Sequence, residues 1–376
     1  MRDDESGSPD QARRSLGQFR ASRALLPVLL GLLIVAFLLY QETVKHGLTP
    51  GEMLARLRWS AGTGLWLFAG VMTMVLRDFG YVWQLRILTD RRLTWVASFQ
   101  VVMLWNFFAA VSPSMVGGGA GIAVWMLCKE GLSLGRSTAI VFTTVFLDQA
   151  FFVSIPLLVS TLIPQHDIFA PLKLIPSDFL GTSVYSAFWS AWGGIAAYVA
   201  LLIAALFVAP SWINWWLRKL ILLPFMHRWR ERGFRVAHDL LMASRDLRAR
   251  STLWWFQVWA ATSVAWIGRY LVLNCVLGAF NEPPMGVFEH VLAIGRQAVL
   301  WIVMLISPTP GSAGIAELGF TWLFKDLVPA GLALTLAIFW RLISYYPHLV
   351  LGVPVMTHWI RRVYGRDVRE EPANTL

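Results

Sequence analysis

Charged side chains inside long apolar stretches are the residues of this sequence best placed to do chemistry. Asp148 lies near the middle of the apolar segment 137–162, and Arg341 lies near the middle of segment 328–357. An ionised group at the centre of a bilayer costs roughly 2.5–3.5 kcal/mol on insertion scales, so such groups face protein or a water-filled cavity. We interpret this acid and base either as a gate or headgroup clamp, or as a buried ion pair that only fixes packing.

Glu317 and Arg296 are the next candidates. Glu317 lies in the first turn of a helix that we predict after a helix break at 307–312. The helix dipole alone explains a carboxylate there, and the alternative is a protonatable group that couples proton movement to transport. Arg296 lies too deep in its apolar run to reach an interface easily, which favours a phosphate or carboxylate partner. Arg269 lies nearer the outer end of its segment, and we expect its side chain to extend outward.

Two apolar regions, 95–128 and 288–324, are interrupted by proline and glycine. Proline removes a backbone donor and glycine loosens a helix, so each break frees polar backbone groups, which cannot face lipid. We predict that they line a cavity, where two helix N-termini converge on an anion such as a lipid phosphate. The alternative is that the glycines only permit tight helix crossing. The break residues assigned to this site are Ser112, Pro113, Gly117, Gly118, Gly119, Pro308, Pro310, Gly311 and Gly314.

The elements that position these residues are membrane-spanning helices. The chain has 376 residues, of which 57% are hydrophobic and 14% charged, well outside the composition of soluble domains. The first apolar run has no small-residue cleavage site after it, so we interpret it as a retained signal anchor. A helix needs roughly 20 residues to cross a bilayer, and six segments qualify as full spans: 24–41, 60–77, 137–162, 184–209, 252–278 and 328–357.

The distribution of basic residues decides how the two broken regions are threaded. If each is a re-entrant hairpin, 23 of the 32 Lys and Arg residues fall in cytoplasmic segments and 5 in outer loops. That asymmetry obeys the positive-inside rule, and threading either region as a full span destroys it. The net charge of +10 therefore indicates topology rather than nucleic-acid binding, because the basic residues flank apolar segments.

The predicted fold is all-α and integral to the membrane, with six full spans and two re-entrant helical hairpins arranged as an inverted-topology repeat. The order span, span, hairpin, span occurs twice, in opposite orientations. Asp148 follows Gly121, and Arg341 follows Gly314, by the same 27 residues. The two therefore occupy equivalent positions, from which an acid and a base can meet at the midplane.

The predicted organisation is a polar tail, two repeats and a second tail. These parts are a cytoplasmic tail at 1–23, a first repeat at 24–162 with the hairpin 95–128, a second repeat at 184–357 with a basic cytoplasmic linker at 210–251 and the hairpin 288–324, and a cytoplasmic tail at 358–376.

Three motifs resemble a known family. They are Ser-Pro-Ser-Met-Val-Gly-Gly-Gly at 112–119, Ser-Pro-Thr-Pro-Gly-Ser-Ala-Gly-Ile-Ala-Glu at 307–317, and Arg341-x-x-x-Tyr345-x-Pro347. Together they are similar to the lysylphosphatidylglycerol synthase/flippase transmembrane region family, from residue 24 to about 360. The resemblance implies a stand-alone lipid flippase and adds Tyr345 to the candidate site. The chain departs from the family's Glu-Arg before the span aspartate, because Val145-Phe146-Leu147 precede Asp148.

We therefore expect a lipid translocase that moves an anionic or zwitterionic lipid between leaflets by alternating access. Two alternatives remain: a membrane-embedded lipid-modifying enzyme that uses Glu317 and Asp148 as acid or base, and a non-transporting assembly or anchor protein. We expect no catalytic residues of the soluble kind, no cofactor and no metal site. The expected partners are membrane lipids and, through coupling, protons, but no nucleic acid. The expected location is the bacterial inner (plasma) membrane, with both termini cytoplasmic.

Overall fold

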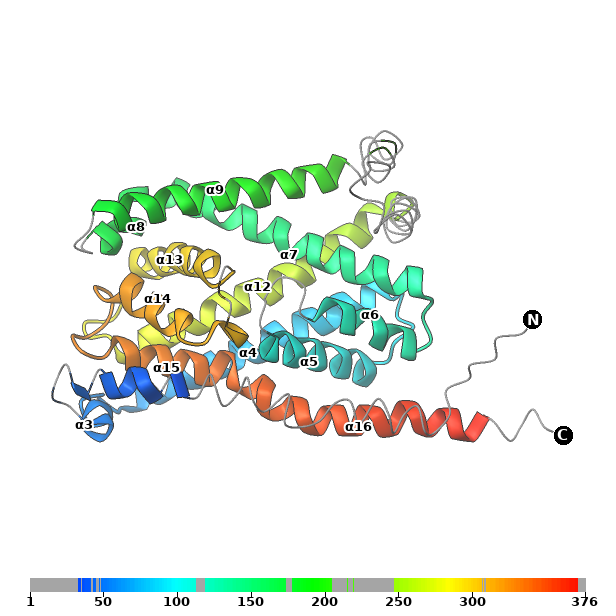
Figure 1. Cartoon of the computed structure of the whole chain (residues 1–376), viewed down its shortest axis with the longest axis horizontal. Helices are drawn as coiled ribbons and strands as arrows, with labels where there is room; N and C mark the ends of the chain where they lie inside the picture. Colours follow the sequence, from blue (N-terminus) through cyan, green and yellow to red (C-terminus); the bar gives the residue numbers. More distant parts are fainter. Residues whose placement is uncertain are drawn as a thin grey trace.

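The computed structural model describes residues 33–34, 36–41, 43–44, 47, 49–112, 119–173, 178–204, 215, 219, 247–305, 307 and 309–370. Within these ranges the chain is helical and has no strand. The elements (Figure 1) are α3 (Pro50–Ala55), α4 (Ala61–Leu88), α5 (Trp95–Val111), α6 (Ala120–Lys129), α7 (Leu134–Leu162), α8 (Gln165–Lys173), α9 (Asp178–Ile203), α12 (Thr252–Phe280), α13 (Val287–Leu305), η3 (Pro310–Ser312), α14 (Ile315–Phe324), α15 (Ala333–Ser344) and α16 (Tyr346–Glu370).

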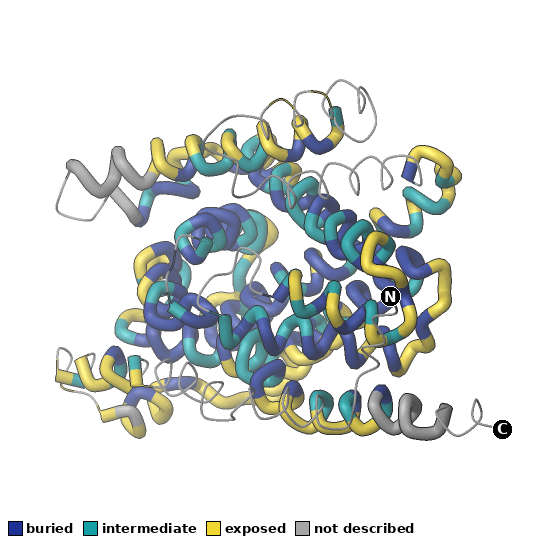
Figure 2. The backbone as a smooth tube through the Cα atoms, turned by 45° about the vertical axis from the view of Figure 1, so that its right-hand side comes forward, coloured by how far each residue is buried: buried dark blue, intermediate teal, exposed yellow. Residues whose placement is uncertain are grey.

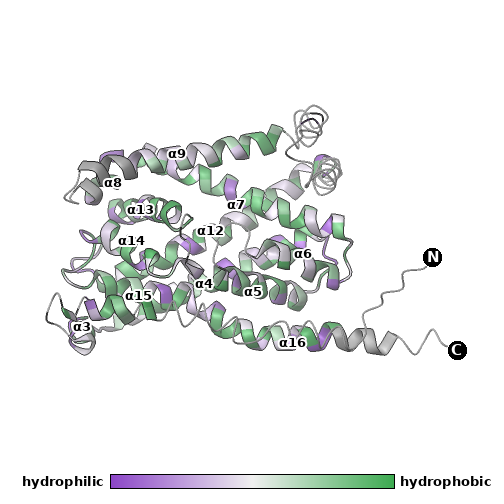
Figure 3. Cartoon of the chain, in the orientation of Figure 1, coloured by the Kyte–Doolittle hydropathy of each residue, from purple (hydrophilic) through white to green (hydrophobic). Residues whose placement is uncertain are grey.

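The fold is that of an all-α integral membrane protein, as predicted. Six helices of the described part are long and apolar enough to cross a membrane: Ala61–Leu88, Leu134–Leu162, Tyr185–Ile203, Thr252–Phe280, Val287–Leu305 and Ala333–Val363. Figure 3 shows apolar residues along most of their length, and Figure 2 shows that exposed residues lie mainly on the outside of the bundle. Apolar side chains such as Leu65, Phe68 and Val75 of α4 are exposed there, as expected of a lipid-facing surface.

Two helices differ from the prediction, and one predicted span cannot be compared with the structure. Most of the predicted span 24–41 lies outside the described residues. Helix α4 continues to Leu88 instead of ending near residue 77, because Arg77 is buried and hydrogen-bonded inside the bundle. Helix α13 is long enough to cross a membrane by itself, although the sequence assigns it to a hairpin arm.

The centre of the molecule is the crossing of α4 and α12, where the two backbones touch. A Cβ atom on Gly80 would lie 2.6 Å from the amide nitrogen of Ala265, and one on Gly268 would lie 2.6 Å from the carbonyl oxygen of Thr73. Small residues allow this close approach in membrane helices. The crossing fixes the faces of α4 and α12 that point toward the remaining spans.

At one end of the bundle, ion pairs join segments that the sequence assigns to the cytoplasm. Asp90, after α4, accepts hydrogen bonds from Arg136 at 2.5 Å and from Arg250 at 2.6 Å. Glu130, after α6, pairs with Arg362 of α16. These five residues come from four different predicted cytoplasmic segments, so the structure gathers those segments together.

Segments assigned to the outside are likewise joined to one another. Arg58, before α4, pairs with Glu282 of the loop after α12. Arg296 of α13 binds the carboxylate of Asp326 at 2.5 Å and the carbonyl oxygen of Asp167 at 2.9 Å. The grouping agrees with the predicted sidedness, while the assignment of either end to the cytoplasm stays a prediction.

The two broken regions have similar helix patterns. α4, α5 and α6 begin at residues 61, 95 and 120, and α12, α13 and α14 begin at 252, 287 and 315, a nearly constant separation along the chain. In Figure 1, α5 and α6 lie toward one end of the molecule and α13 and α14 toward the other. Opposite placement is what two hairpins entering from opposite faces require. The re-entrant threading and the inverted repeat stay predictions.

Candidate functional site

A cavity of about 350 Å³ lies beside the α4–α12 crossing and is also lined by α5, α7, α13, α15 and α16. Five ionisable side chains that are charged or can become charged near neutral pH line it: Arg77, Asp148, Arg269, Arg341 and His348. Asp148 is the middle residue of α7, and His348 is the middle residue of the span Ala333–Val363. These residues therefore lie about half-way through the bundle, at the depth where charge is most costly.

The first group of polar side chains lies in and beside the cavity, at the second helix break. Glu317 accepts a hydrogen bond from the amide of Gly314 at 2.6 Å and another from Nε of Arg341 at 3.1 Å. Arg341 also donates to the carbonyl oxygen of Gly311 at 2.7 Å. The side chains of Glu317 and Arg341 are only 1% and 5% exposed, so they form a buried ion pair. The pair ties α15 to the start of α14 and to the break itself.

The backbone of this break adopts left-handed conformations. Gly311 has φ 55° and Gly314 has φ 84°, values that glycine accepts without strain from a side chain. The ring of Tyr345 occupies the space where a side chain on Gly311 would lie. The Tyr345 hydroxyl donates to the carbonyl oxygen of Ala110 at 3.1 Å, in the last turn of α5. Tyr345 therefore connects the second break to the helix that leads into the first.

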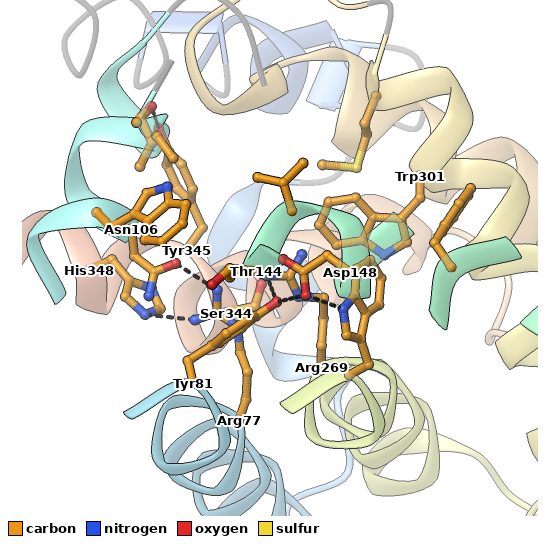
Figure 4. Close-up of a pocket in the computed structure, with 18 of the residues that line it drawn as sticks. Arg77, Tyr81, Asn106, Thr144, Asp148, Arg269, Trp301, Ser344, Tyr345 and His348 are labelled. Carbon is orange, nitrogen blue, oxygen red and sulfur yellow. Dashed lines mark hydrogen bonds between the residues drawn. The ribbon is translucent and has the colours of Figure 1, made fainter. Parts of the chain in front are cut away.

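The second group surrounds Arg77 of α4 (Figure 4). Its guanidinium donates to Asp78 at 2.7 Å. It also donates to the side-chain oxygen of Asn106 at 2.9 Å. Nε2 of His348 lies 2.9 Å from Nη1 of Arg77 and 3.2 Å from Oδ1 of Asp78. One buried network thus connects α4, α5 and α16.

The third group surrounds Asp148 (Figure 4). Its Oδ1 accepts hydrogen bonds from Nε1 of Trp266 at 2.7 Å and from the Tyr81 hydroxyl at 3.2 Å. Nη2 of Arg269 donates to the same hydroxyl at 3.3 Å. The guanidinium carbon of Arg269 lies 4.8 Å from the ring centroid of Trp266 and 4.9 Å from that of Trp301. A carboxylate and a guanidinium therefore face one cavity with a single hydroxyl between them.

The structure brings together Asp148 and Arg341 as neighbours of one cavity, but not as partners of each other. Asp148 binds side chains of α4 and α12, while Arg341 binds Glu317 within its own half of the chain. Glu317 does not line the cavity; its contacts are those of a helix-start carboxylate paired with an arginine. Arg296 lies outside the cavity and is bound to Asp326, so its guanidinium is not presented to a headgroup there.

The break residues divide into four sets. Gly119 and Gly311 line the cavity, and the indole of Trp105 occupies the space beside Gly119 that a side chain would need. Ser112 ends α5 by donating its amide to the carbonyl oxygen of Phe108. Pro310 and Gly314 lie at the second break without lining the cavity. Four assigned residues lie outside the described part of the chain: Pro113, Gly117, Gly118 and Pro308.

The sequence interpretation missed several polar side chains of the cavity, namely Arg77, Tyr81, Asn106 and His348. The expectation that Arg269 extends outward was wrong, because its side chain lines the cavity. Two signals were available. Arg77 and Asp78 are adjacent charges, and ten further residues of helix follow them. Two charges at the end of a span would not be followed by so long a continuation of the helix. His348 follows Arg341 by seven residues, two turns of helix, and therefore shares its face wherever helix is continuous.

Comparison with known proteins agrees with the three motifs. The family described as Lysylphosphatidylglycerol synthase TM region matches residues 24–352. A protein of Archaeoglobus fulgidus, described as UPF0104 membrane protein, is 24% identical over 322 residues, which cover 79% of this chain and 88% of that relative. No solved structure matches the chain. A polar cavity inside an apolar helical bundle and a family match over most of the sequence lead to one conclusion: this chain is a multi-pass membrane protein that belongs to the lysylphosphatidylglycerol synthase transmembrane-region family.

Proposed function

We propose that this protein moves a membrane lipid with an anionic or zwitterionic headgroup from one leaflet to the other. The observation that carries the proposal is the cavity of about 350 Å³ half-way along the spans, with three arginines in its wall. A headgroup cannot cross the hydrocarbon region without polar contacts, and this cavity offers charged donors at that depth.

The helix break at Gly311 supports the proposal that the wall of the cavity moves. Arg341 and Tyr345 hold the break at Gly311 against α15 and α5, through the bonds to the carbonyl oxygens of Gly311 and Ala110. Irregular backbone of this kind lines the substrate sites of many secondary transporters, in which one part of the molecule moves against another around the site. In the proposed cycle the contacts around Gly311 exchange as the cavity opens to one leaflet and then to the other.

The test is leaflet exchange in liposomes that contain the purified full-length chain. Lipids labelled with a fluorophore on an acyl chain are loaded, and dithionite reports the outward-facing fraction over time. We expect exchange that protein-free liposomes lack, and slower exchange for Arg341→Ala at equal reconstitution. Exchange no faster than in protein-free liposomes would refute the proposal. Mass spectrometry of the same liposomes would reveal a new lipid species if the chain were a lipid-modifying enzyme.

A further inference from the structure

Among the described residues, Arg269 has no carboxylate oxygen within 4 Å, in contrast to the other two arginines of the cavity. Arg77 donates to Asp78 at 2.7 Å, and Arg341 donates to Glu317 at 3.1 Å. Across the described residues, Arg269 makes one hydrogen bond, a long one of 3.3 Å to the Tyr81 hydroxyl. A guanidinium has five N–H donors in a fixed fork, so most of those of Arg269 remain available to a ligand in the cavity.

Asp148 has an unused acceptor on the same cavity wall. Both of its donors, Trp266 and Tyr81, bind Oδ1. No residue of the described chain donates to Oδ2, and Asp148 forms no ion pair within 4 Å there. A carboxylate accepts at both oxygens, so Oδ2 is left for a cationic donor.

The aromatic side chains hold these two groups apart and in place. The ring faces of Trp266 and Trp301 flank the Arg269 guanidinium, which compensates part of its desolvation without neutralising its charge. The Tyr81 hydroxyl accepts from Arg269 and donates to Asp148, so it fixes the positive and negative groups one hydroxyl apart. A separation of this kind suits a ligand whose own charges are a few bonds apart.

We propose that Arg269, Tyr81 and Asp148 form a receptor for a zwitterionic phosphate headgroup, with the phosphate on Arg269 and an ammonium group on Oδ2 of Asp148. This rests on the proposed function and narrows its substrate from anionic or zwitterionic lipids to zwitterionic ones. A purely anionic headgroup satisfies Arg269 but leaves the Asp148 carboxylate unpaired and repelling it. A headgroup of the phosphoethanolamine type satisfies both groups with one molecule.

The first experiment compares two lipids that carry the fluorophore on an acyl chain, phosphatidylethanolamine and phosphatidylglycerol, in the same liposomes. The parent chain should move phosphatidylethanolamine about ten- to a hundredfold faster, the factor expected for one charge-assisted hydrogen bond. Asp148→Asn keeps an oxygen for Trp266 and Tyr81 but removes the charge, so it should abolish the preference. Arg269→Gln should slow both lipids, because both carry a phosphate. Arg58→Gln, at an 83% exposed side chain away from the cavity, is the matched control and should change neither rate.

The second experiment measures binding without transport and separates a lipid headgroup from a free anion. The thermal unfolding midpoint of the detergent-solubilised full chain is recorded with phosphoethanolamine, glycerol phosphate or inorganic phosphate. We expect phosphoethanolamine to raise the midpoint most, and Asp148→Asn to remove that advantage. Equal stabilisation by inorganic phosphate would overturn the receptor and indicate a simple anion site.

The outcomes distinguish this receptor from the proposed function. If the parent moves both lipids at the same rate and Asp148→Asn changes nothing, translocation stands and the receptor is wrong. If no lipid moves, but phosphoethanolamine stabilises the chain in a manner that depends on Asp148, the receptor stands and translocation is wrong.

Discussion

Removing one member of the buried pair Glu317–Arg341 should destabilise the fold strongly, whereas removing both should not. In Glu317→Leu, the Arg341 guanidinium stays 5% exposed with the carbonyl oxygen of Gly311 as its remaining hydrogen-bond acceptor. Leaving such a charge unpaired lowers the free energy of unfolding by about 3–5 kcal/mol. Arg341→Met should lower it by a similar amount, because the Glu317 carboxylate is then buried without its partner. In the double variant neither charge of this pair remains, and the remaining loss of stability is about 1–2 kcal/mol for the lost bonds to Gly314 and Gly311.

The assay is a double-mutant cycle of the free energy of unfolding, from SDS titration in mixed micelles followed by circular dichroism. The surface pair Arg58–Glu282 provides the matched control, since exposed pairs contribute about 0–1 kcal/mol. Single variants within about 1 kcal/mol of the parent, or a double variant equal to the sum of the singles, would contradict our interpretation of the pair. The double variant should still exchange lipid poorly, because Arg341 lines the cavity.

Three further predictions follow from the packing and the charges. Gly80→Val should destabilise the α4–α12 crossing by about 1–3 kcal/mol or more, whereas Gly121→Ala, with open space around it, should be close to neutral, both by SDS titration. Tyr345→Phe should lose about 0.5–1.5 kcal/mol of unfolding free energy with the bond to Ala110 and keep the ring beside Gly311; a loss as large as that of Tyr345→Ala would be the contrary result. Hydrogen bonds from Arg250 and Arg136 hold the pKa of Asp90 below its ordinary value, so its contribution to stability is present above that value and lost as pH falls through the folded pKa. Because Asp90 is 35% exposed, Asp90→Asn should cost under about 1 kcal/mol at pH 7 and nothing once Asp90 is protonated in both states, and an equal cost at both pH values would contradict the assignment.

The sequence predicted the class of the fold because apolar length and charge cost are local properties. Asp148 and Arg341 could be recognised as cavity residues without a structure, since few positions tolerate a charge in mid-span. The distribution of Lys and Arg likewise predicted the two sets of segments that the ion pairs of Asp90 and Arg296 hold together.

What the sequence could not supply were the partners of each charge. Arg296 lies outside the cavity and pairs with Asp326, thirty residues later in the chain. No feature of the sequence near Arg296 predicts that contact. Arg269 faces inward because its neighbour Gly268 is the point where α12 touches α4, which turns that face of the helix toward the cavity. In the sequence, Arg77 resembles a charge that marks the end of a span. In the structure, its guanidinium contacts the side chains of Asn106 and His348, which come from two distant elements.

In the proposed receptor, a lipid headgroup occupies the cavity between Arg269 and Asp148. A structure determined in nanodiscs with and without phosphatidylethanolamine tests it directly. We expect headgroup density inside the cavity only when that lipid is present, with the phosphate beside Arg269 and the ammonium group beside Asp148. An empty cavity in phosphatidylethanolamine nanodiscs, for a preparation that exchanges the same lipid in liposomes, would contradict it.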